Sequence, residues 1–394
     1  MRDYRALKVA NVALITVGLL LSLSFTVLSQ PYTWTTIAGL AGVSGSADGT
    51  NSAARFNYPE GLALDSAGNL YVANEHDHTI RQMTPVGPDW VVTTVAGMPG
   101  VAGSADGTNS NARFNYPHGV AVDTAGNLFV TDEGNHAVRQ IARVGTNWVV
   151  TTVANGFGLP LGIAISAGNL YVADQYGTIR MITPVGTNWV VTTVAHGLAS
   201  PWGITVDSAG NLFVMEPIRV WKFVPAGTSW VGTVICSLPG VTATDIALDN
   251  AGDLYVSTSS CWIDKITPAG TNWVISTIGG NGQSGSTDGT GGAARFSLSY
   301  GITSDGNGTV YVGDSANQTI RMGRFRPQLQ TSLSGNQLLL SWPLAASNFV
   351  LETSGTLSAD ASWRPLTDGI RISNGNFVLT NDTHAATAFY RLRE

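Results

Sequence analysis

Apolar and polar residues alternate with a period of two along most of the chain. In the stretch Asn115–Ile141, two alternating runs, Gly119–Asp123 and Asn127–Thr131, are separated by a glycine-containing turn. A polar loop then leads to a third run, Ala137–Ile141. Such alternation is typical of strands that bury one face. Three short strands cannot bury that face alone, so the stretch requires neighbours of the same kind.

Internal repeats supply these neighbours. Six segments share a strand–turn–strand core, and they begin at Gly61, Gly119, Gly162, Gly203, Asp245 and Gly301. Five of the six continue through a third strand into a fourth, which reads WVVTTVA in three repeats. Each repeat is therefore predicted to form a four-stranded antiparallel sheet, and such sheets repeated around an axis form a β-propeller. The pattern predicts an all-β fold built on a six-bladed propeller.

The sixth repeat lacks a fourth strand of its own, since it ends at Met322–Phe325. A matching segment lies near the N-terminus, where Tyr32–Gly39 aligns with Trp90–Gly97 of the first repeat. We therefore expect the N-terminal strand to pair with the last repeat and to close the ring non-covalently. Without that strand, the last sheet would present a long unpaired edge.

Three similar insertions interrupt the repeat spacing. They precede the first, second and sixth repeats, at Gly45–Pro59, Gly103–Pro117 and Gly285–Ser299. These repeats are neighbours in a closed ring, so we expect the three long loops to lie in one sector of one face. Their shared Asp-Gly and Ala-Arg-Phe elements favour a structural role, and a wall beside the channel mouth is the functional alternative.

The N-terminus is predicted to be an export signal over residues 1–29. The basic residues Arg2, Arg5 and Lys8 precede an apolar run, Val9–Leu28, and small or compact residues follow at a plausible cleavage site. The run approaches membrane-spanning length, so an uncleaved anchor is the alternative. Either reading places the protein outside the cytoplasm, secreted or in the cell envelope (periplasm or extracellular space).

Two further parts follow the signal. Residues 30–325 are predicted to form the propeller. Residues 326–394 contain short strand-like runs separated by Ser, Gly, Asn and Asp turns, which is typical of a small β-sandwich.

Composition narrows the classes of partner. Only 12% of residues are charged, and 46 glycines and 11 tryptophans suit an all-β protein with many tight turns. The formal net charge is −6 and no basic run stands out, which argues against nucleic acid as a partner. A membrane contact is expected only through the N-terminal segment. The partner is predicted to be a protein, peptide or carbohydrate, and the protein a monomer.

The repeat core GVAVDTAGNLFVTDEGNHAVRQI closely resembles the NHL repeat, and all six repeats carry versions of it. The resemblance implies a six-bladed propeller that acts as a binding platform, as NHL propellers commonly do for proteins, RNA or ligands. A few similar proteins are enzymes, among them the peptidyl-hydroxyglycine lyase half of peptide-amidating proteins, and gluconolactonase-like enzymes share the six-bladed shape. The C-terminal LLLSWP and FYRLR runs resemble fibronectin-type-III-like modules of secreted bacterial proteins.

One register position varies while its surroundings repeat. It lies just before the residue that opens each inner strand, and it holds Glu60, His118, Leu161, Trp202, Thr244 and Tyr300. Repeat geometry places all six around the mouth of the central channel, where they are predicted to form a ligand-binding ring. Acid and histidine side chains could share a proton or a metal, and the two aromatic rings offer flat surfaces. The alternative is that these side chains only plug the channel.

Metal chemistry is the enzymatic alternative. The lyase relatives bind zinc through histidines in a Pro-His context, which only Pro117-His118 matches, whereas a catalytic zinc normally has three protein ligands. Gluconolactonase-like enzymes bind their metal through a Glu, an Asn and an Asp. In this chain only the Glu has a counterpart, which is Glu60. The loops Asn74–His78 and Asp132-Glu133 carry oxygen ligands that calcium accepts. Glu60 and His118 are thus the weak metal candidates, with calcium or zinc as the ion, for a metal-assisted lyase or lactone hydrolase. A binding scaffold without catalytic residues is the preferred prediction.

The two cysteines form the last candidate site. Cys236 ends the fourth strand of the fourth repeat, and Cys261 begins the third strand of the fifth. Both strand ends should face the same side of adjacent blades, and an exported chain with two cysteines favours a disulfide.

Overall fold

The computed structural model describes residues 12–13, 32–238, 240–327, 329–334, 337–343, 349–356, 361–373, 376–382 and 388–393. The chain divides into two compact units, one of which is Pro31–Phe325 and the other Met1–Gln30 with Arg326–Glu394. Apart from Val12 and Ala13, the predicted signal peptide lies outside the described residues. Among the residues that are described, no helix is long and apolar enough to cross a membrane.

Six antiparallel sheets of four or five strands make up the Pro31–Phe325 unit. The first contains β4 (Pro59–Leu64), β5 (Leu70–Asn74), β6 (Thr79–Val86) and β7 (Asp89–Ala96). The second contains β9 (Pro117–Val122), β10 (Leu128–Asp132), β11 (Ala137–Val144) and β12 (Asn147–Asn155). The third contains β13 (Pro160–Ser166), β14 (Asn169–Asp174), β15 (Thr178–Val185) and β16 (Asn188–His196).

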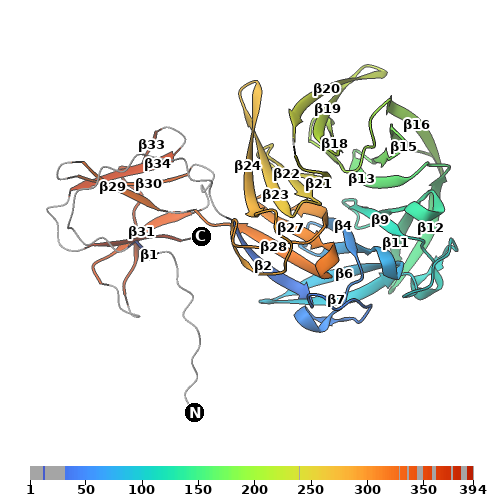
Figure 1. Cartoon of the computed structure of the whole chain (residues 1–394), viewed down its shortest axis with the longest axis horizontal. Helices are drawn as coiled ribbons and strands as arrows, with labels where there is room; N and C mark the ends of the chain where they lie inside the picture. The colour runs from blue at the N-terminus through green and yellow to red at the C-terminus, as the bar shows by residue number, and fades with distance from the viewer. Residues whose placement is uncertain are drawn as a thin grey trace, which may run out of the picture. The chain divides into compact units, whose positions relative to one another are not determined.

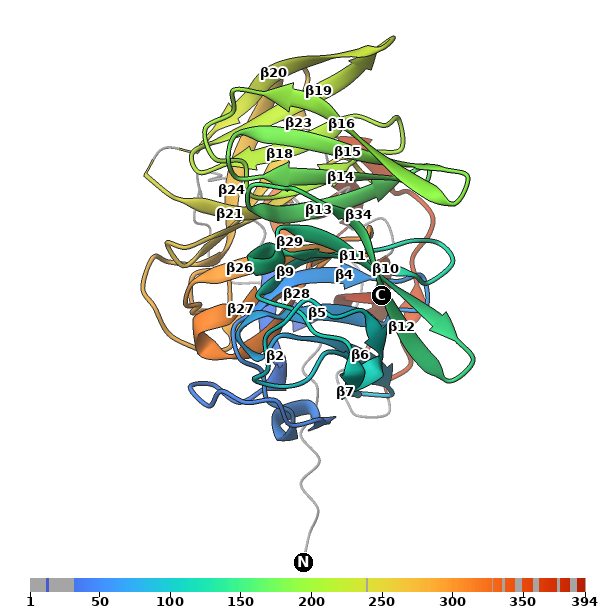
Figure 2. The same ribbon diagram turned by 90° about the vertical axis from the view of Figure 1, so that its right-hand side faces the viewer.

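The other three sheets follow the same plan. The fourth contains β17 (Ile204–Val206), β18 (Leu212–Glu216), β19 (Arg219–Ala226) and β20 (Ser229–Ser237). The fifth contains β21 (Ala243–Leu248), β22 (Leu254–Thr258), β23 (Trp262–Ala269) and β24 (Asn272–Gly280). The sixth contains β26 (Ser299–Ser304), β27 (Thr309–Asp314), β28 (Thr319–Phe325) and β2 (Tyr32–Gly39). Figure 2 shows how strands β13 to β16 of the third sheet lie side by side.

The six sheets stand around an axis as the repeat pattern predicts. Each inner strand contacts the inner strand of the next sheet, in the order β4, β9, β13, β17, β21 and β26. Strand β26 in turn contacts β4, so each of the six inner strands lies beside the inner strands of two other sheets (Figure 1). The first strand of each repeat therefore lies at the centre, and the fourth lies at the rim.

Strand β2 lies in the sixth sheet, paired antiparallel with β28 from Tyr32↔Phe325 to Gly39↔Thr319. Its Trp34 side chain is fully buried and donates a hydrogen bond from Nε1 to the carbonyl of Ile278 at 2.9 Å. The N-terminal segment thus supplies both backbone pairing and core to the last sheet.

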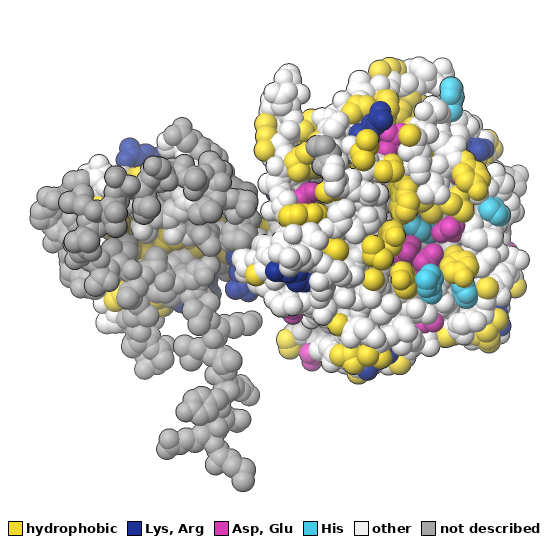
Figure 3. Space-filling view, viewed as in Figure 1, with side chains coloured by type: hydrophobic (Ala, Val, Ile, Leu, Met, Phe, Trp, Pro, Cys, Tyr) yellow, Lys and Arg dark blue, Asp and Glu magenta, His cyan; other side chains and the backbone are white. Residues whose placement is uncertain are grey.

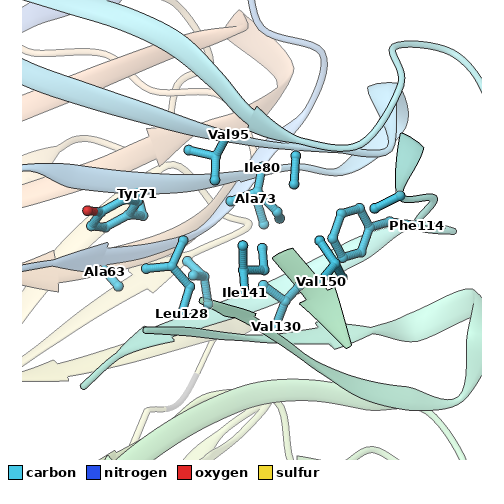
Figure 4. Close-up of a cluster of buried hydrophobic side chains, with 13 residues drawn as sticks. Ala63, Tyr71, Ala73, Ile80, Val95, Phe114, Leu128, Val130, Ile141 and Val150 are labelled. Carbon is cyan, nitrogen blue, oxygen red and sulfur yellow. The ribbon is translucent and has the colours of Figure 1, made fainter. Parts of the chain in front are cut away.

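Apolar clusters between neighbouring sheets form the core. Figure 4 shows one of them, in which Tyr71 and Ile80 of the first sheet pack against Leu128, Val130 and Ile141 of the second. A sheet between two neighbours buries both of its faces, which explains why second strands of the repeats, such as β5 and β10, are buried along their whole length.

Each of the three insertions carries a two-residue strand that pairs with the outer strand of its own sheet. These strands are β3 (Gly49–Thr50) on β7, β8 (Gly107–Thr108) on β12 and β25 (Gly289–Thr290) on β2. Two insertions continue into the 3-10 helices η1 (Asn51–Ala53) and η3 (Asn109–Asn111). Each of the three insertions also carries one phenylalanine, at position 56, 114 or 296. All three rings are fully buried, so this part of each insertion belongs to the core.

The remaining described strands form two four-stranded antiparallel sheets. One contains β29 (Gln330–Ser334), β30 (Gln337–Pro343), β34 (Asn376–Asp382) and β33 (Arg371–Ser373), and the other contains β1 (Val12–Ala13), β35 (Phe389–Arg393), β31 (Val350–Ser354) and β32 (Arg364–Pro365). Buried Leu340, Trp342 and Leu351 give this unit an apolar core. The sandwich and its fibronectin-III-like character stay predictions.

Deleting Pro31–Gly39 is expected to expose the edge of β28 and to remove Trp34 from the core. The shortened protein should aggregate, because an unpaired strand edge pairs with other chains. Trp34→Ala keeps the strand and should cost about 3–5 kcal/mol of unfolding free energy. Size-exclusion chromatography and guanidinium unfolding measure the two effects. A monomeric deletion variant as stable as the full chain would refute the role of β2.

Candidate functional site

The varying ring position lies where the inner strands begin, and it surrounds a cavity of about 250 Å³. His118, Trp202, Thr244 and Tyr300 line this cavity, as the sequence predicts for the channel mouth. Figure 3 shows acidic side chains and histidines gathered near the centre of the propeller face. The ring position therefore borders a cavity on the propeller axis.

Two of the six ring residues do not offer side chains to the cavity. Leu161 is 3% exposed and is not among the lining residues. Glu60 is 5% exposed and lies behind the lining, where it contacts His118. Thr244 lines the cavity, but its hydroxyl donates to the carbonyl of Ser299 at 2.6 Å and so helps to join two sheets.

Close approach of the inner strands explains why glycine opens five of them. A Cβ at Gly61 would overlap the carbonyl of His118 in the next sheet, and one at Gly301 would overlap that of Glu60. The fifth sheet has Asp245 at this position. Its carboxylate accepts hydrogen bonds from the backbone N–H of Ile246 at 2.8 Å and of Ile302 at 3.1 Å.

Asp245 is a cavity-lining acid that sequence reasoning missed. Burial raises the pKa of its carboxyl to about 7, although two backbone N–H groups and nearby His118 favour the charged form. The signal was present in the sequence, since Asp245 is the one break in the glycine pattern of the six inner strands.

A buried acid pair lies behind the cavity. Glu60 of β4 lies near Glu75 of the 3-10 helix η2 (Glu75–Asp77), close enough for the charge of Glu60 to raise the pKa of Glu75. Burial raises the pKa of Glu60 to about 8, and burial with the Glu60 charge raises that of Glu75 to about 8. Glu133, of the next 3-10 helix η4 (Glu133–Asn135), also has a raised pKa because it is buried. Burial therefore favours the protonated forms of all three carboxyls.

His118 connects this acid pair to the cavity. Its Nε2 lies 2.9 Å from Oε2 of Glu60, at ion-pair distance but without the alignment of a hydrogen bond. Within the described part of the chain, Nδ1 of His118 and Oε2 of Glu60 are both buried without a hydrogen-bond partner. Buried polar atoms are normally paired, so these two atoms are exceptions to that rule.

Aromatic rings form the other wall. Trp202 and Tyr300 lie nearly parallel, 9° apart, with ring centroids separated by 6.0 Å. A second group lies beside the acid pair, where Tyr58 stacks on His76 at 4.1 Å and His76 meets Tyr116 edge-on. Sequence reasoning found the first pair but missed the second, because these tyrosines belong to the repeated insertions.

The described residues do not fit the metal sites weighed from the sequence. Glu60 and His118 meet each other, but no group of three or more His, Cys, Asp or Glu side chains in the described ranges could hold an ion. In the proposed calcium loops, both carboxylate oxygens of Asp132 accept hydrogen bonds, from the N–H of Asn115 and from Arg139. Asn74 is likewise engaged with Asp77. We therefore derive no metal-dependent step.

The predicted disulfide between Cys236 and Cys261 is wrong, since both thiols are free. Cys236, on β20, packs against the core between the fourth and fifth sheets. Cys261, in the turn before β23, is buried in the core between the fifth and sixth sheets. The two side chains thus lie on opposite faces of the fifth sheet, which strand ends alone do not reveal.

Comparison with known proteins agrees with this architecture. Residues 56–83 and 114–141 match the family model of the NHL repeat. The chain is 33% identical over 97 residues to the chloroplastic protein SUPPRESSOR OF QUENCHING 1 of Arabidopsis thaliana, a match that covers 25% of this chain and 9% of that protein. The chain therefore spans only a small part of this relative.

Solved structures show the same fold at low identity. A protein of unknown function from Bacteroides thetaiotaomicron superposes with a TM-score of 0.59 at 20% identity, over 74% of this chain and 76% of that one. An auxiliary nutrient binding protein from the same organism gives a TM-score of 0.58 at 17% identity, with the same coverage. Such likeness establishes the fold alone.

Glu60→Gln is expected to reduce the pH dependence of stability. The folded protein keeps a proton on Glu60 up to about pH 8, whereas the ordinary pKa of glutamate is 4.5. This contribution is complete below pH 4.5 and is lost as the pH rises through 8, by up to about 1.4 kcal/mol per pH unit. Guanidinium unfolding between pH 5 and pH 8 should therefore show a shallower decline in the variant.

Glu75→Gln tests the other carboxyl of the pair, whose pKa is also raised to about 8. Its effect should be similar to that of Glu60→Gln, and the double variant should show less than the sum of the two. A decline as steep as that of the wild type in both single variants would contradict the buried acid pair.

Proposed function

We propose that this chain, a propeller built from NHL repeats, is a binding protein that captures its ligand at the channel mouth. The ligand class best suited to the site carries hydrogen-bond donors and a flat apolar face. A carbohydrate or the amino end of a peptide has both features. The observation that supports this most directly is the cavity itself, lined by His118, Trp202, Asp245 and Tyr300.

The aromatic wall supports a ligand with a flat face. Trp202 and Tyr300 come from the fourth and sixth sheets, and the small Thr244 of the fifth sheet lies at the ring position between them. Both rings are only partly buried, and they contact each other. An apolar ligand face laid against them would exchange solvent for aromatic surface.

The charge of the mouth supports a donor-rich ligand. No Lys or Arg is among the residues that line the cavity. Asp245 lies in the lining, and Glu60, Glu75 and Glu133 lie close enough to one another to influence each other's pKa. A ligand amine or hydroxyl in the cavity would meet the carboxylate of Asp245, which lies in the lining and can accept a hydrogen bond.

The shared fold is consistent with such a role. One protein of this fold is described as an auxiliary nutrient binding protein, and a binding role is what we propose for this chain as well. The proposal also includes export, which the basic residues before the apolar run Val9–Leu28 support, and action as a monomer. Ring closure by β2 belongs to the same proposal, and its pairing with β28 supports it.

Trp202→Ala is expected to weaken every ligand that binds the mouth by about three- to tenfold, because it removes half of the aromatic wall. A thermal-shift screen of neutral monosaccharides, disaccharides and primary amines would first identify compounds that raise the unfolding temperature. Calorimetric titration of wild type and variant then measures the loss.

Trp148→Phe serves as the control, since Trp148 is a partly buried tryptophan on the outer strand β12. This variant should bind every compound as the wild type does. Compounds that bind Trp202→Ala and wild type equally well would place binding elsewhere on the molecule.

A further inference from the structure

Half of the sheets have a covered outer edge, and half do not. In the first, second and sixth sheets the insertion strands β3, β8 and β25 pair with the outer strand. The described outer strands β16, β20 and β24 of the other sheets pair with no such strand and lie at the rim (Figure 1). They expose large apolar side chains, such as Val190 at 45%, Val231 at 54% and Val274 at 54%.

The second sheet shows how an edge is covered. Gly107 and Thr108 pair with Val150 and Val149 of β12. The carboxylate of Asp106 accepts hydrogen bonds from the backbone N–H of Thr152 at 3.1 Å, from its hydroxyl at 2.9 Å and from the guanidinium of Arg139 at 2.7 Å. The Asp-Gly-Thr segment is therefore held by both backbone pairing and charge.

Its next residue continues the pattern, because Asn109 accepts from the N–H of Trp148 at 2.8 Å and donates to Asn147 at 3.0 Å. The first and sixth sheets repeat the charged part. Arg81 binds Asp48 at 2.7 Å and Arg321 binds Asp288 at 3.0 Å. The same mode of binding thus occurs three times in the molecule: a segment that begins with Asp-Gly-Thr pairs with an outer strand, and an arginine binds its aspartate.

The third sheet has the same kind of outer strand and an equivalent arginine, but no Asp-Gly-Thr segment of the described chain pairs with it. Its outer strand Thr187–Ala195 is identical in sequence to Thr146–Ala154 of the second sheet. Arg180 pairs in register with Thr193 just as Arg139 pairs with Thr152. The guanidinium of Arg180 also lies over a phenylalanine ring, that of Phe157, at 5.9 Å. The short connection between β12 and β13 supplies this ring, but it contains no aspartate.

Arg180 has no acidic partner among the described residues. Its counterparts Arg139 and Arg321 each bind two carboxylates, whereas the described structure gives Arg180 no ion pair. Asp174 does not compensate, because its oxygens accept from the N–H groups of Gly158 and Leu159. A partly buried cation without a partner favours an incoming carboxylate.

We propose that the outer edge of the third sheet binds an extended Asp-Gly-Thr-Asn segment of another polypeptide by strand addition. The aspartate pairs with Arg180 and the N–H of Thr193, glycine and threonine pair with Val191 and Val190, and the asparagine meets Trp189. The fourth and fifth sheets lack this site, since Trp221 and Asp264 replace the arginine. The three Asp-Gly segments within the chain are already bound to their own sheets, so a second copy is not the partner.

A labelled peptide of sequence Gly-Ser-Ala-Asp-Gly-Thr-Asn-Ser, taken from Gly103–Ser110, tests the proposal with the full chain. Fluorescence anisotropy should show saturable binding. Replacing the peptide's aspartate by asparagine should weaken binding about tenfold or more, because a charge-assisted contact is lost. Arg180→Met should weaken it to the same extent. Lys222→Met, on the uncovered fourth sheet, should leave it unchanged.

A stability measurement separates this site from a merely structural arginine. Arg139→Met should lower the unfolding temperature, since it leaves buried Asp132 without its cation. Arg180→Met should not lower it, because no bound carboxylate is abandoned. The proposal fails if the peptide does not saturate at millimolar concentration, if its asparagine version binds equally well, or if Arg180→Met unfolds as easily as Arg139→Met. Self-association that Arg180→Met abolishes would instead identify a second copy as the occupant and overturn the assignment.

Discussion

Each four-stranded sheet in this ring can bury its two faces only against its two neighbours. No single sheet has a core of its own, so the apolar clusters belong to pairs of sheets, as between the first and second. The same constraint brings the inner strands so close together that glycine opens five of them. It also places the residue before each glycine at the channel mouth, which is why a repeated scaffold can present a varied surface there.

Much of this architecture could be predicted because the constraint leaves a periodic trace in the sequence. Alternation gives the strands, spacing gives six sheets, and the missing fourth strand of the last repeat identifies Tyr32–Gly39 as its substitute. Facing directions were harder to predict. Cys236 and Cys261 end strands in adjacent sheets, yet a side chain's face depends on the exact register at a turn, and the two thiols lie in different cores.

The candidate site was predicted in outline and missed in its chemistry. The ring position is visible in the sequence, but the partner of Glu60 is Glu75, which reaches the mouth from a 3-10 helix after the second strand. Alignment of the inner strands alone could not predict this proximity, because Glu75 lies outside them. Asp245 was the opposite case, since it occupies an aligned position that holds glycine in the other five repeats and was not recognised as a site residue. A single deviation from an otherwise repeated residue, such as Asp245, can therefore indicate a site residue as clearly as a position that differs in every repeat.

The position of β2 has a consequence for how the chain must be made. Trp34 leaves the ribosome early, yet its hydrogen-bond acceptor Ile278 lies 244 residues later. Strand β2 can therefore reach its place only after most of the chain has been made, and a contact between such distant residues closes a long loop. Until then the nascent propeller stays open, with an unpaired edge and an unfilled core position.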